Sequence, residues 1–318
     1  MKLRVRSVTW EAEGILSFVL VGIDGQPLPA FEAGAHIDVR IPGGLSRRYS
    51  LCNAPGDTTH YQIAVLHVPD SRGGSRAMHE RVRPGDVLEV SEPHNFFPLH
   101  EEARTSVLIA GGIGITPLLA MMERLLALGR DFRLHYCTTS PERTAFAQRL
   151  GALVIQGRVQ IHHDGGNPGK GLDIAALLKA RPEGAHLYYC GPNGFMRAVE
   201  SAASHWPADS VHCEYFGAAP TSVAPGTNAS IDDERVPVEL LKSGRTIHVH
   251  ASQTLLAALR EAGVPCESSC EAGMCGTCKV AYTGGPPEHH DLVLSEDEQA
   301  HAVLTCCART RVPLALDL

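Results

Sequence analysis

Four cysteines in the last quarter of the chain follow a ligand-like spacing, C-x4-C-x2-C with a fourth cysteine 28 residues later: Cys270, Cys275, Cys278 and Cys306. This is the plant-type 2Fe–2S pattern. Because four thiolates must converge on a small cluster, three of them come from one tight loop. Gly273 and Gly276 let the backbone of that loop fold close around the sulfides. The spacing therefore predicts a 2Fe–2S cluster held by these four cysteines.

The alternatives to a cluster are a structural zinc site and reduced cysteines without a metal. Zinc sites usually pair two C-x2-C knuckles, and the x4 interval does not have that form. Cys306 and Cys307 are adjacent, so one of them must be chosen as the fourth ligand. The stretch resembles the ferredoxin pattern when Cys306 is that ligand.

The 318-residue chain has room for two or three domains, and its 20% of charged residues is ordinary for a globular protein. The net charge of −7 argues against nucleic acid as a partner, and residues 232–318 carry −6 of it. This acidic end either docks on a basic partner surface or is a solvated face. The amino terminus has no apolar stretch, and no run approaches the roughly 18 apolar residues of a membrane span. We therefore expect a cytoplasmic protein that contacts no membrane, and a monomer is the simplest expectation.

Residues 1–100 read as short strands broken by turns. Apolar residues alternate in Ile37-Val39-Ile41 and in Tyr61-Ile63-Val65, whereas Gly43-Gly44 and Pro84-Gly85-Asp86 supply turns. Short strands at regular intervals predict a closed antiparallel β-barrel.

The pattern changes in residues 101–220. Ser106–Ala110 is a continuous apolar strand, as expected where both faces of a sheet are covered. A helix with one apolar stripe begins at Thr116-Pro117 and ends at Gly129. Strand and helix signals then continue through four segments: Phe132–Cys137, Val159–His162, Ile174–Leu178 and Leu187–Cys190. This alternation predicts an α/β domain with a doubly wound parallel sheet.

Residues 221–232 belong to a stretch rich in Pro, Gly, Ser and Thr, which is typical of an interdomain linker. Residues 233–318 then form a third, α+β domain. A hairpin turns at Ser243-Gly244, and a helix over Leu255–Glu261 is capped by Ser252 or Thr254. The cysteine loop follows this helix.

A glycine-rich loop follows the first apolar strand of the α/β domain. Gly111, Gly112 and Gly114 let the backbone approach a pyrophosphate, whose charge the N-terminus of the helix at Thr116 favours. Pro117 stands where the usual dinucleotide fingerprint has a third Gly or Ala. Such a loop alone is weak evidence, but here it lies between a strand and a helix.

Three further motifs strengthen this interpretation, because each offers groups suited to a flavin or a nucleotide. Tyr189-Cys190-Gly191-Pro192 ends another apolar strand. In Arg47-Arg48-Tyr49-Ser50, Arg47 supplies a fork for phosphate, Tyr49 an aromatic face and Ser50 a hydroxyl for a ring nitrogen. Gly73-Gly74-Ser75 offers bare N–H groups for a second phosphate contact.

The ordered set RRYS, GGS, GGIGITP, YCGP, EYFGA and CEAGMCGTC resembles the phthalate dioxygenase reductase family, which includes vanillate O-demethylase reductases. The resemblance spans the whole chain. It implies a flavin-binding barrel, a central NAD domain and a C-terminal β-grasp ferredoxin. It also implies FMN as the flavin and NADH as the electron donor.

By the same resemblance, Arg47, Arg48, Tyr49 and Ser50 hold the flavin, with Gly73, Gly74 and Ser75 around its phosphate. Phe216 packs near the flavin ring. Gly111, Gly112, Gly114, Gly191 and Pro192 hold the nucleotide. Ser50, Thr116 and Cys190 are the expected catalytic residues, with Thr116 close to both cofactors and Cys190 beside the nicotinamide.

One departure from the family concerns the strand end Cys137-Thr138-Thr139-Ser140-Pro141, where the acidic residue that often holds an adenosine ribose is absent. That absence weakens the preference for NADH, and nearby Arg143 offers a partner for the 2′-phosphate of NADPH.

The implied function is transfer of electrons from NADH to FMN and then singly through the cluster to a separate Rieske-type oxygenase. The chain has no C-x-H…C-x2-H Rieske pattern, so that oxygenase is another polypeptide. Two alternatives are a nonenzymatic iron–sulfur carrier and a ferredoxin–NADP reductase-type enzyme with FAD. The sequence does not name the organic substrate.

Overall fold

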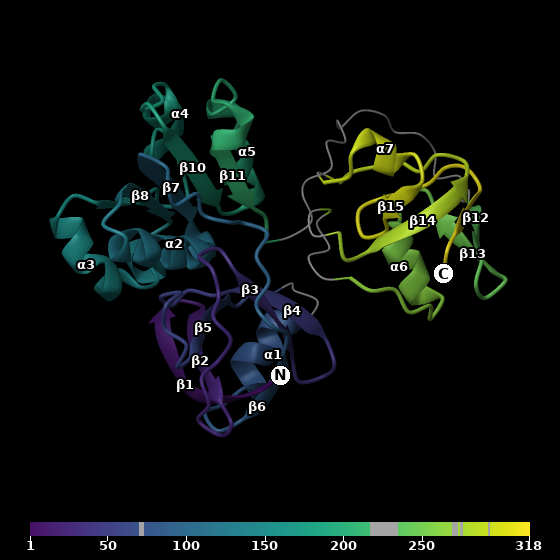
Figure 1. Ribbon diagram of the computed structural model, residues 1–318, viewed down its shortest axis with the longest axis horizontal. Coiled ribbons are helices and arrows are strands. Elements are labelled where there is room, and N and C mark those ends of the chain that lie inside the picture. The colour runs from purple at the N-terminus through teal and green to yellow at the C-terminus, as the bar shows by residue number, and fades with distance from the viewer. Residues whose placement is uncertain (70–72, 217–234, 269–272, 274–275, 292) are drawn as a thin grey trace. The chain divides into compact units, whose positions relative to one another are not determined.

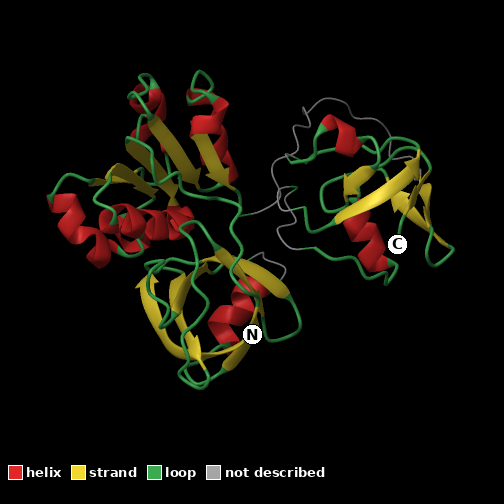
Figure 2. Cartoon of the chain, viewed as in Figure 1, coloured by secondary structure: helices red, strands yellow, loops and turns green. Residues whose placement is uncertain are grey.

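The computed structural model describes residues 1–69, 73–216, 235–268, 273, 276–291 and 293–318. The chain divides into two compact units, Met1–Tyr215 and Phe216–Leu318. Figure 1 labels the elements of both, and Figure 2 colours them by type.

The first unit begins with a six-stranded antiparallel sheet in the order β4-β3-β6-β1-β2-β5, with the short helix α1 beside it (Figure 1). Its elements are β1 (Lys2–Ala12), β2 (Ile15–Gly22), β3 (His36–Arg40), β4 (Ser46–Ser50), β5 (Tyr61–Leu66), α1 (Gly74–Arg81) and β6 (Val87–Val90). Alternate side chains enter one core, where Phe18, Ile37 and Ile63 are fully buried. Each contributes roughly 1.5–3 kcal/mol through burial.

The two edges of this sheet meet just beyond β4. The Cys52 N–H donates to the Gln62 carbonyl oxygen of β5 (2.9 Å), and the Gln62 N–H donates to Asn53 Oδ1 (3.0 Å). These bonds satisfy edge groups that would otherwise face water. The predicted barrel is thereby confirmed as a barrel-like closed sheet.

The same unit continues with a five-stranded parallel sheet in the order β11-β10-β7-β8-β9. Its elements are β7 (Thr105–Gly111), α2 (Ile115–Ala127), β8 (Asp131–Thr138), α3 (Ala147–Ile155), β9 (Val159–His163), α4 (Ile174–Leu178), β10 (Ala185–Cys190), α5 (Asn193–Ala202) and β11 (Val211–Glu214). The predicted doubly wound sheet is confirmed.

Helices cover both faces of the parallel sheet, as Figure 1 shows. Leu108, Leu134 and Tyr188 pack in the core that contains α2 and α3. Their neighbours Ile109 and Leu187 point to the opposite face, toward α4 and α5. Burial on both faces explains why these strands read as continuous apolar runs rather than as alternating ones.

Hydrogen bonds from α3 and from the turn after β8 help to join the barrel to the parallel-sheet part of the first unit. Arg149 of α3 donates to the Cys52 carbonyl oxygen (2.8 Å) and also pairs with Glu123 of α2 (2.9 Å). The Glu13 N–H donates to the Glu142 carbonyl oxygen (2.8 Å). These bonds fix the barrel against α3 and against the turn that follows β8.

The second unit is a mixed five-stranded sheet in the order β13-β12-β16-β14-β15 with α6 packed on it. Its elements are β12 (Arg235–Leu240), β13 (Arg245–His250), α6 (Leu255–Glu261), β14 (Lys279–Gly284), α7 (Glu296–Gln299), β15 (Ala302–Leu304) and β16 (Leu314–Leu316). Thr254 is the cap of α6, because its side chain accepts from the Ala257 N–H (3.3 Å). The predicted hairpin and helix are both present.

The predicted linker, residues 221–232, lies outside the described residues. No helix in the described part of the chain is both long and apolar enough to cross a membrane.

Candidate active site

Three strands of the parallel sheet end side by side at its carboxyl edge. In the strand register, Cys190 of β10 pairs with Ala110 of β7 on one side and with Glu214 of β11 on the other. Open α/β sheets bind ligands just beyond this edge. The predicted residues of the glycine-rich loop and of the YCGP motif therefore meet at one place.

Close approach of two backbones explains the glycines at this edge. A Cβ on Gly114 would overlap the carbonyl group of Cys190 and lie 2.7 Å from the Gly191 nitrogen. A Cβ on Gly111 would lie 2.9 Å from Pro192 Cδ, and Gly112 has φ +54°. A side chain would press on backbone at Gly114 and on the Pro192 and Phe195 side chains at Gly111, and at Gly112 the positive φ favours glycine.

Thr116 lies in the first turn of α2, directly after a 3-10 turn at Gly112–Gly114. Its hydroxyl donates to the Ile113 carbonyl oxygen (3.1 Å), and the side chain is buried. The prediction that Thr116 stands where loop and helix meet is confirmed, whereas its catalytic role remains a prediction.

The barrel reaches the same edge through the last residue of β4. Ser50 Oγ donates a 3.0 Å hydrogen bond to Glu214 Oε2, and both side chains are buried. Period-2 alternation puts Arg48 on the same face of β4 as Ser50. Sequence reasoning missed Glu214, although it stands two residues before Phe216 in the EYFGA motif, and an acidic residue at a strand end is a usable signal.

Burial sets the charge state of Glu214. It raises the pKa of this carboxyl to about 7, while the hydrogen bond from Ser50 and the nearby Arg48 guanidinium act in the opposite direction. The Arg48 guanidinium in turn lies 5.4 Å from the centre of the Phe96 ring. A carboxyl with a pKa near neutrality is able to hold or release a proton at physiological pH.

Cys190 stands beside this carboxyl as a fully buried thiol. Burial raises its pKa well above the usual range, and the neighbouring Glu214 and Cys213 add to the effect. Cys190 is therefore a neutral thiol at neutral pH, which suits an apolar contact rather than attack as a thiolate.

A second group of predicted flavin residues gathers at the N-terminus of α1. A Cβ on Gly74 would lie 2.9 Å from both Cγ and Nε of Arg47, so the guanidinium passes directly over this glycine. Gly73, with φ +89°, precedes the helix. A cation beside helix N–H groups fits a phosphate well. Ser75 uses its hydroxyl to accept from the Val68 N–H (3.1 Å).

The remaining predicted flavin residues differ in their surroundings. Tyr49 is half-buried against the barrel core, and burial raises the pKa of its hydroxyl, so the ring is neutral. Phe216 begins the second unit with 47% of its surface exposed. Its place beside the flavin ring remains a prediction.

Two of the four predicted cluster ligands lie within the described residues. The side chains of Cys278 and Cys306 are buried in one hydrophobic cluster with Leu256 and Leu304. Both the N–H and the hydroxyl of Thr305 donate to the Cys278 carbonyl oxygen (3.1 and 3.2 Å), which ties the two segments together. Cys270 and Cys275 lie outside the described residues.

Gly273, which stands between Cys270 and Cys275 in the sequence, packs closely on the segment that carries the fourth cysteine. A Cβ on Gly273 would lie 2.9 Å from Cys307 Sγ, and Gly273 has φ +71°. The lack of a side chain at residue 273 therefore allows the backbone there to approach Cys307. Two buried cysteines held next to each other, with Gly273 packed against the neighbouring Cys307, suit the convergence of thiolates that a cluster requires.

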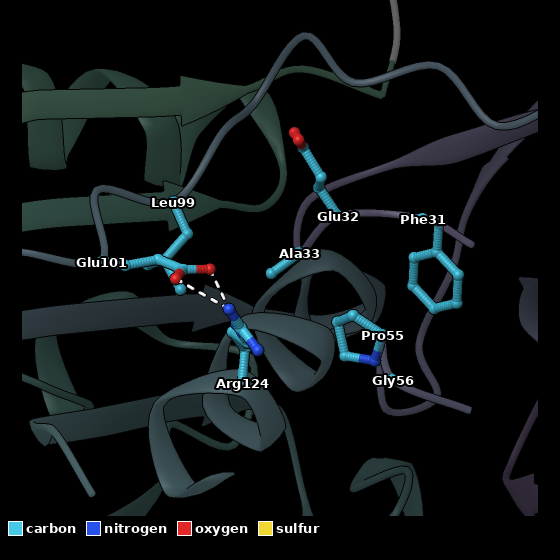
Figure 3. A pocket seen from close by; sticks show the side chains of 8 residues that line it. All are labelled: Phe31, Glu32, Ala33, Pro55, Gly56, Leu99, Glu101 and Arg124. Carbon is cyan, nitrogen blue, oxygen red and sulfur yellow. Dashed lines mark hydrogen bonds and ion pairs between the residues drawn. The ribbon is translucent and has the colours of Figure 1, made fainter. Parts of the chain in front are cut away.

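A separate pocket of about 500 Å³ lies in the first unit, and Figure 3 shows its lining. Glu101 accepts two hydrogen bonds from Arg124 (2.7 and 2.9 Å), so the charge of the guanidinium is offset by a carboxylate inside the pocket lining. None of the predicted cofactor residues lines this pocket, so it is distinct from the site at the sheet edge.

Comparison with known proteins supports this arrangement. Residues 238–311 match the 2Fe-2S iron-sulfur cluster binding domain family. The chain is 45% identical to vanillate O-demethylase oxidoreductase of a Pseudomonas species over 312 residues, covering 96% of each chain. A solved structure of phthalate dioxygenase reductase, 41% identical, matches with a TM-score of 0.79 over 100% of this chain and 98% of its own. The chain belongs to the phthalate dioxygenase reductase family.

The same fold also occurs inside a larger protein, an intact type IV self-sufficient cytochrome P450 monooxygenase. That structure is 38% identical, with a TM-score of 0.76, and the match covers 100% of this chain and 41% of the P450 chain.

Membership of the phthalate dioxygenase reductase family confirms the main predictions about activity. The chain is an oxidoreductase, the reductase component of an oxygenase system, and FMN and a 2Fe–2S cluster are its cofactors. Its partner is a separate oxygenase component. An enzyme is thus established in preference to a nonenzymatic carrier.

Proposed function

We propose that Ser50, Glu214 and Cys190 form the place where the two electrons of NADH enter this reductase. The proposal rests on one observation, the hydrogen bond of 3.0 Å that joins the barrel strand β4 to the edge strand β11 beside Cys190. Ser50 orients the carboxyl, and Glu214, with its pKa near 7, holds a proton close to the reacting atoms. Cys190 supplies a buried, neutral contact for the nicotinamide.

The remaining site residues bind and orient the cofactors. Arg47 and the N-terminus of α1 at Gly73 and Gly74 bind the flavin phosphate, whereas Arg48 and Tyr49 flank the flavin. When bound, FMN accepts two electrons and releases them singly, which a cluster requires. Gly111, Gly112, Gly114, Gly191, Pro192 and Thr116 hold the nucleotide at the sheet edge.

We assign the electron donor as NADH in preference to NADPH. Arg143, the residue available for a 2′-phosphate, is engaged by Glu13 of the barrel (Nε to Oε2, 3.2 Å). A guanidinium already paired with a carboxylate offers less attraction to a phosphate.

The domain functions follow the predicted boundaries: flavin binding in residues 1–100, nucleotide binding in 101–220, a linker at 221–232 and the cluster in 233–318. Cys270, Cys275, Cys278 and Cys306 are the proposed ligands. We also propose that the protein is a monomer and that it acts in the cytoplasm.

We infer that the partner is a Rieske-type oxygenase that acts on an aromatic or related small molecule. Plant-type clusters lie at about −400 mV and Rieske centres at roughly −150 to +300 mV, so transfer between them is downhill. A cytochrome P450 is the second candidate, because a reductase of this fold is part of a self-sufficient P450.

The partner is tested by mixing the NADH-reduced chain anaerobically with either the oxygenase component of a vanillate O-demethylase or a bacterial P450. We expect the Rieske centre to become reduced, as followed by electron paramagnetic resonance, at least tenfold faster than the P450 haem. Faster haem reduction would contradict the assignment.

The site itself is tested through Cys190. We expect Cys190→Ala to lower the rate of flavin reduction at saturating NADH by about tenfold, because the nicotinamide loses a buried contact that positions it. Cys213→Ala is the matched control, since Cys213 is the residue before Glu214 on β11 and its side chain points to the opposite face. Equal losses in both variants would contradict the role of Cys190.

A further inference from the structure

Three histidines meet on the first unit, outside the residues that the reductase activity uses. His186 lies on β10, His212 lies on the edge strand β11, and His100 belongs to the connection between β6 and β7. One ring nitrogen from each residue lies within 4.8 Å of one ring nitrogen from each of the others. Among the described residues, no other set of three or more His, Cys, Asp or Glu side chains brings its ligand atoms this close together.

The three imidazoles form an ordered packing. His186 Nδ1 and His212 Nε2 lie 2.9 Å apart in a hydrogen bond, with ring planes only 4° from parallel. The His100 ring stacks on both, with centroid distances of 4.7 Å. The Tyr188 ring stacks on the His212 ring with a centroid distance of 4.7 Å. The Tyr188 hydroxyl oxygen accepts a hydrogen bond from the backbone N–H of His100 (2.8 Å). The backbone of His100 is therefore fixed to the sheet edge.

Burial favours the uncharged form of two of these histidines, His186 and His212. It lowers the pKa of His212 to about 4, and the nearby His100 and His186 lower it further, while Asp209 opposes the shift. The pKa of His186 is lowered by burial first and then by His100 and Arg181, whereas Asp209 raises it. Neutral imidazoles keep a free lone pair on one nitrogen, which is the form that binds metal.

We propose that His100, His186 and His212 bind one divalent first-row transition-metal ion, with zinc as the best match. Three imidazole donors suit Zn, Cu and Ni, whereas Mg and Ca require oxygen ligands. Two Zn–N bonds of about 2.1 Å at a tetrahedral angle place their nitrogens about 3.4 Å apart, against 2.9 Å here. The rings of His186 and His212 turn slightly to direct both lone pairs at the ion, which replaces the shared proton.

Such an ion ties the connection between barrel and parallel sheet to the edge of that sheet. The site leaves a fourth position for water or for an outside ligand, because the protein supplies three donors. Binding to the folded protein alone raises the stability of the first unit with metal concentration. The inference does not depend on the residue roles proposed for the reductase site.

A second histidine pair on the same sheet serves as an internal comparison. His135 Nδ1 and His162 Nε2 lie 3.2 Å apart with stacked rings, on β8 and β9. In the described part of the chain, no third ligand completes this pair within the range that defines the first group. The pair therefore offers two donors where the proposed site offers three.

The proposal is tested by isothermal titration of zinc chloride into the holoenzyme, after adventitious metal has been removed on a chelating resin. We expect one equivalent to bind to the wild type. His100→Gln and His212→Gln should weaken that binding at least tenfold, whereas His162→Gln should leave it unchanged. His100 is exposed, so its replacement leaves the packing of the sheet intact. Iron and sulfide contents, measured before and after titration, verify that the cluster stays intact.

A second readout follows the thermal unfolding of the first unit. Zinc should raise the transition temperature of the wild type and of His162→Gln, and leave that of His100→Gln unmoved, while calcium should have no effect on any of them. Failure of the wild type to bind zinc, or equal zinc binding by wild type and His100→Gln, would overturn the proposal.

Discussion

Ser50 donates a hydrogen bond to Glu214 across a sequence separation of 164 residues, and the bond joins the last residue of a barrel strand to the last residue of a parallel strand. Both groups are buried, so the bond is made away from water. The barrel and the parallel sheet thereby share one polar contact at the edge where the nucleotide loop begins.

Removal of the Ser50 hydroxyl tests this contact. We expect Ser50→Ala to lower the rate of flavin reduction by NADH about 10–100-fold, because the buried carboxyl loses its donor and its orientation. The rate is measured anaerobically by stopped-flow absorbance. Ser17→Ala is the matched control, because Ser17 also donates to a glutamate, Glu11, in the same barrel (2.7 Å). A loss of similar size in both variants would show a general effect on the barrel.

The pH dependence of stability follows from the raised pKa of Glu214. Between its unfolded value near 4.5 and its folded value of about 7, the folded chain holds a proton that the unfolded chain has lost. The contribution of Glu214 to the free energy of unfolding is therefore fully present at low pH, and it is lost as the pH rises to about 7. The glutamine in Glu214→Gln does not titrate. We therefore expect the free energy of unfolding of this variant to rise by about 2 kcal/mol relative to that of the wild type as the pH goes from 5.5 to 7.

Tryptophan fluorescence during urea unfolding measures this difference in the correct part of the molecule. Both tryptophans of the chain, Trp10 and Trp206, lie in the first unit. A constant difference between Glu214→Gln and the wild type across that pH range would contradict the assigned charge state.

The close approach of the glycine-rich loop to β10 predicts a severe effect of Gly114→Ala. The added methyl group overlaps the Cys190 carbonyl, so the loop must shift. We expect the KM for NADH to rise at least tenfold and the first unit to lose about 1–3 kcal/mol of stability. Gly151→Ala, in α3, has open space around it and should keep the wild-type KM and gain about 0.5–1 kcal/mol.

Single cysteine variants decide between the two adjacent thiols of the second unit. We expect Cys278→Ser and Cys306→Ser to retain less than about a tenth of the wild-type iron and sulfide, because a cluster needs all four ligands. Cys307→Ser should keep both, since the Cys307 thiol contacts the Leu304 carbonyl oxygen (3.5 Å) and is not assigned as a ligand. Loss of iron in Cys307→Ser with retention in Cys306→Ser would reverse the assignment.

The ion pair between Arg143 and Glu13 predicts the effect of Glu13→Ala on nucleotide choice. A freed guanidinium attracts the 2′-phosphate, so kcat/KM for NADPH should rise relative to NADH. Both side chains are more than half exposed, which limits the change to about 2–5-fold. Glu102→Ala, which removes the exposed partner of Arg130 elsewhere in the unit, should leave the ratio unchanged. If the ratio of kcat/KM for NADPH to that for NADH is unchanged in Glu13→Ala, Arg143 does not take part in nucleotide selection.

Local patterns in the sequence predict the elements well, because the physics that they report is local. The apolar run at Ser106–Ala110 predicts a strand covered on both faces, and β7 is such a strand. The glycines at 111, 112 and 114 predict approach of the backbone to a pyrophosphate, which stays a prediction, and the structure adds a close approach of Gly114 to the backbone of Cys190. The predicted helix over Leu255–Glu261 is present, and Thr254, one of its two candidate caps, is the N-cap.

Contacts between distant segments were beyond the reach of such patterns. Glu214 becomes a site residue only because the fold brings β11 beside β10 and beneath the end of β4. In the same way, His100, His186 and His212 are spread over more than a hundred residues and form no motif. Strand order and register, rather than sequence spacing, decide which side chains meet.

The central claim is that one chain carries electrons from NADH through its flavin to its own cluster. It is tested most directly by adding NADH anaerobically to the purified protein while the visible spectrum is recorded. We predict that the flavin peaks and the broad iron–sulfur absorption beneath them both bleach within seconds. A protein without these absorptions, or one whose colour NADH does not bleach, would contradict the account.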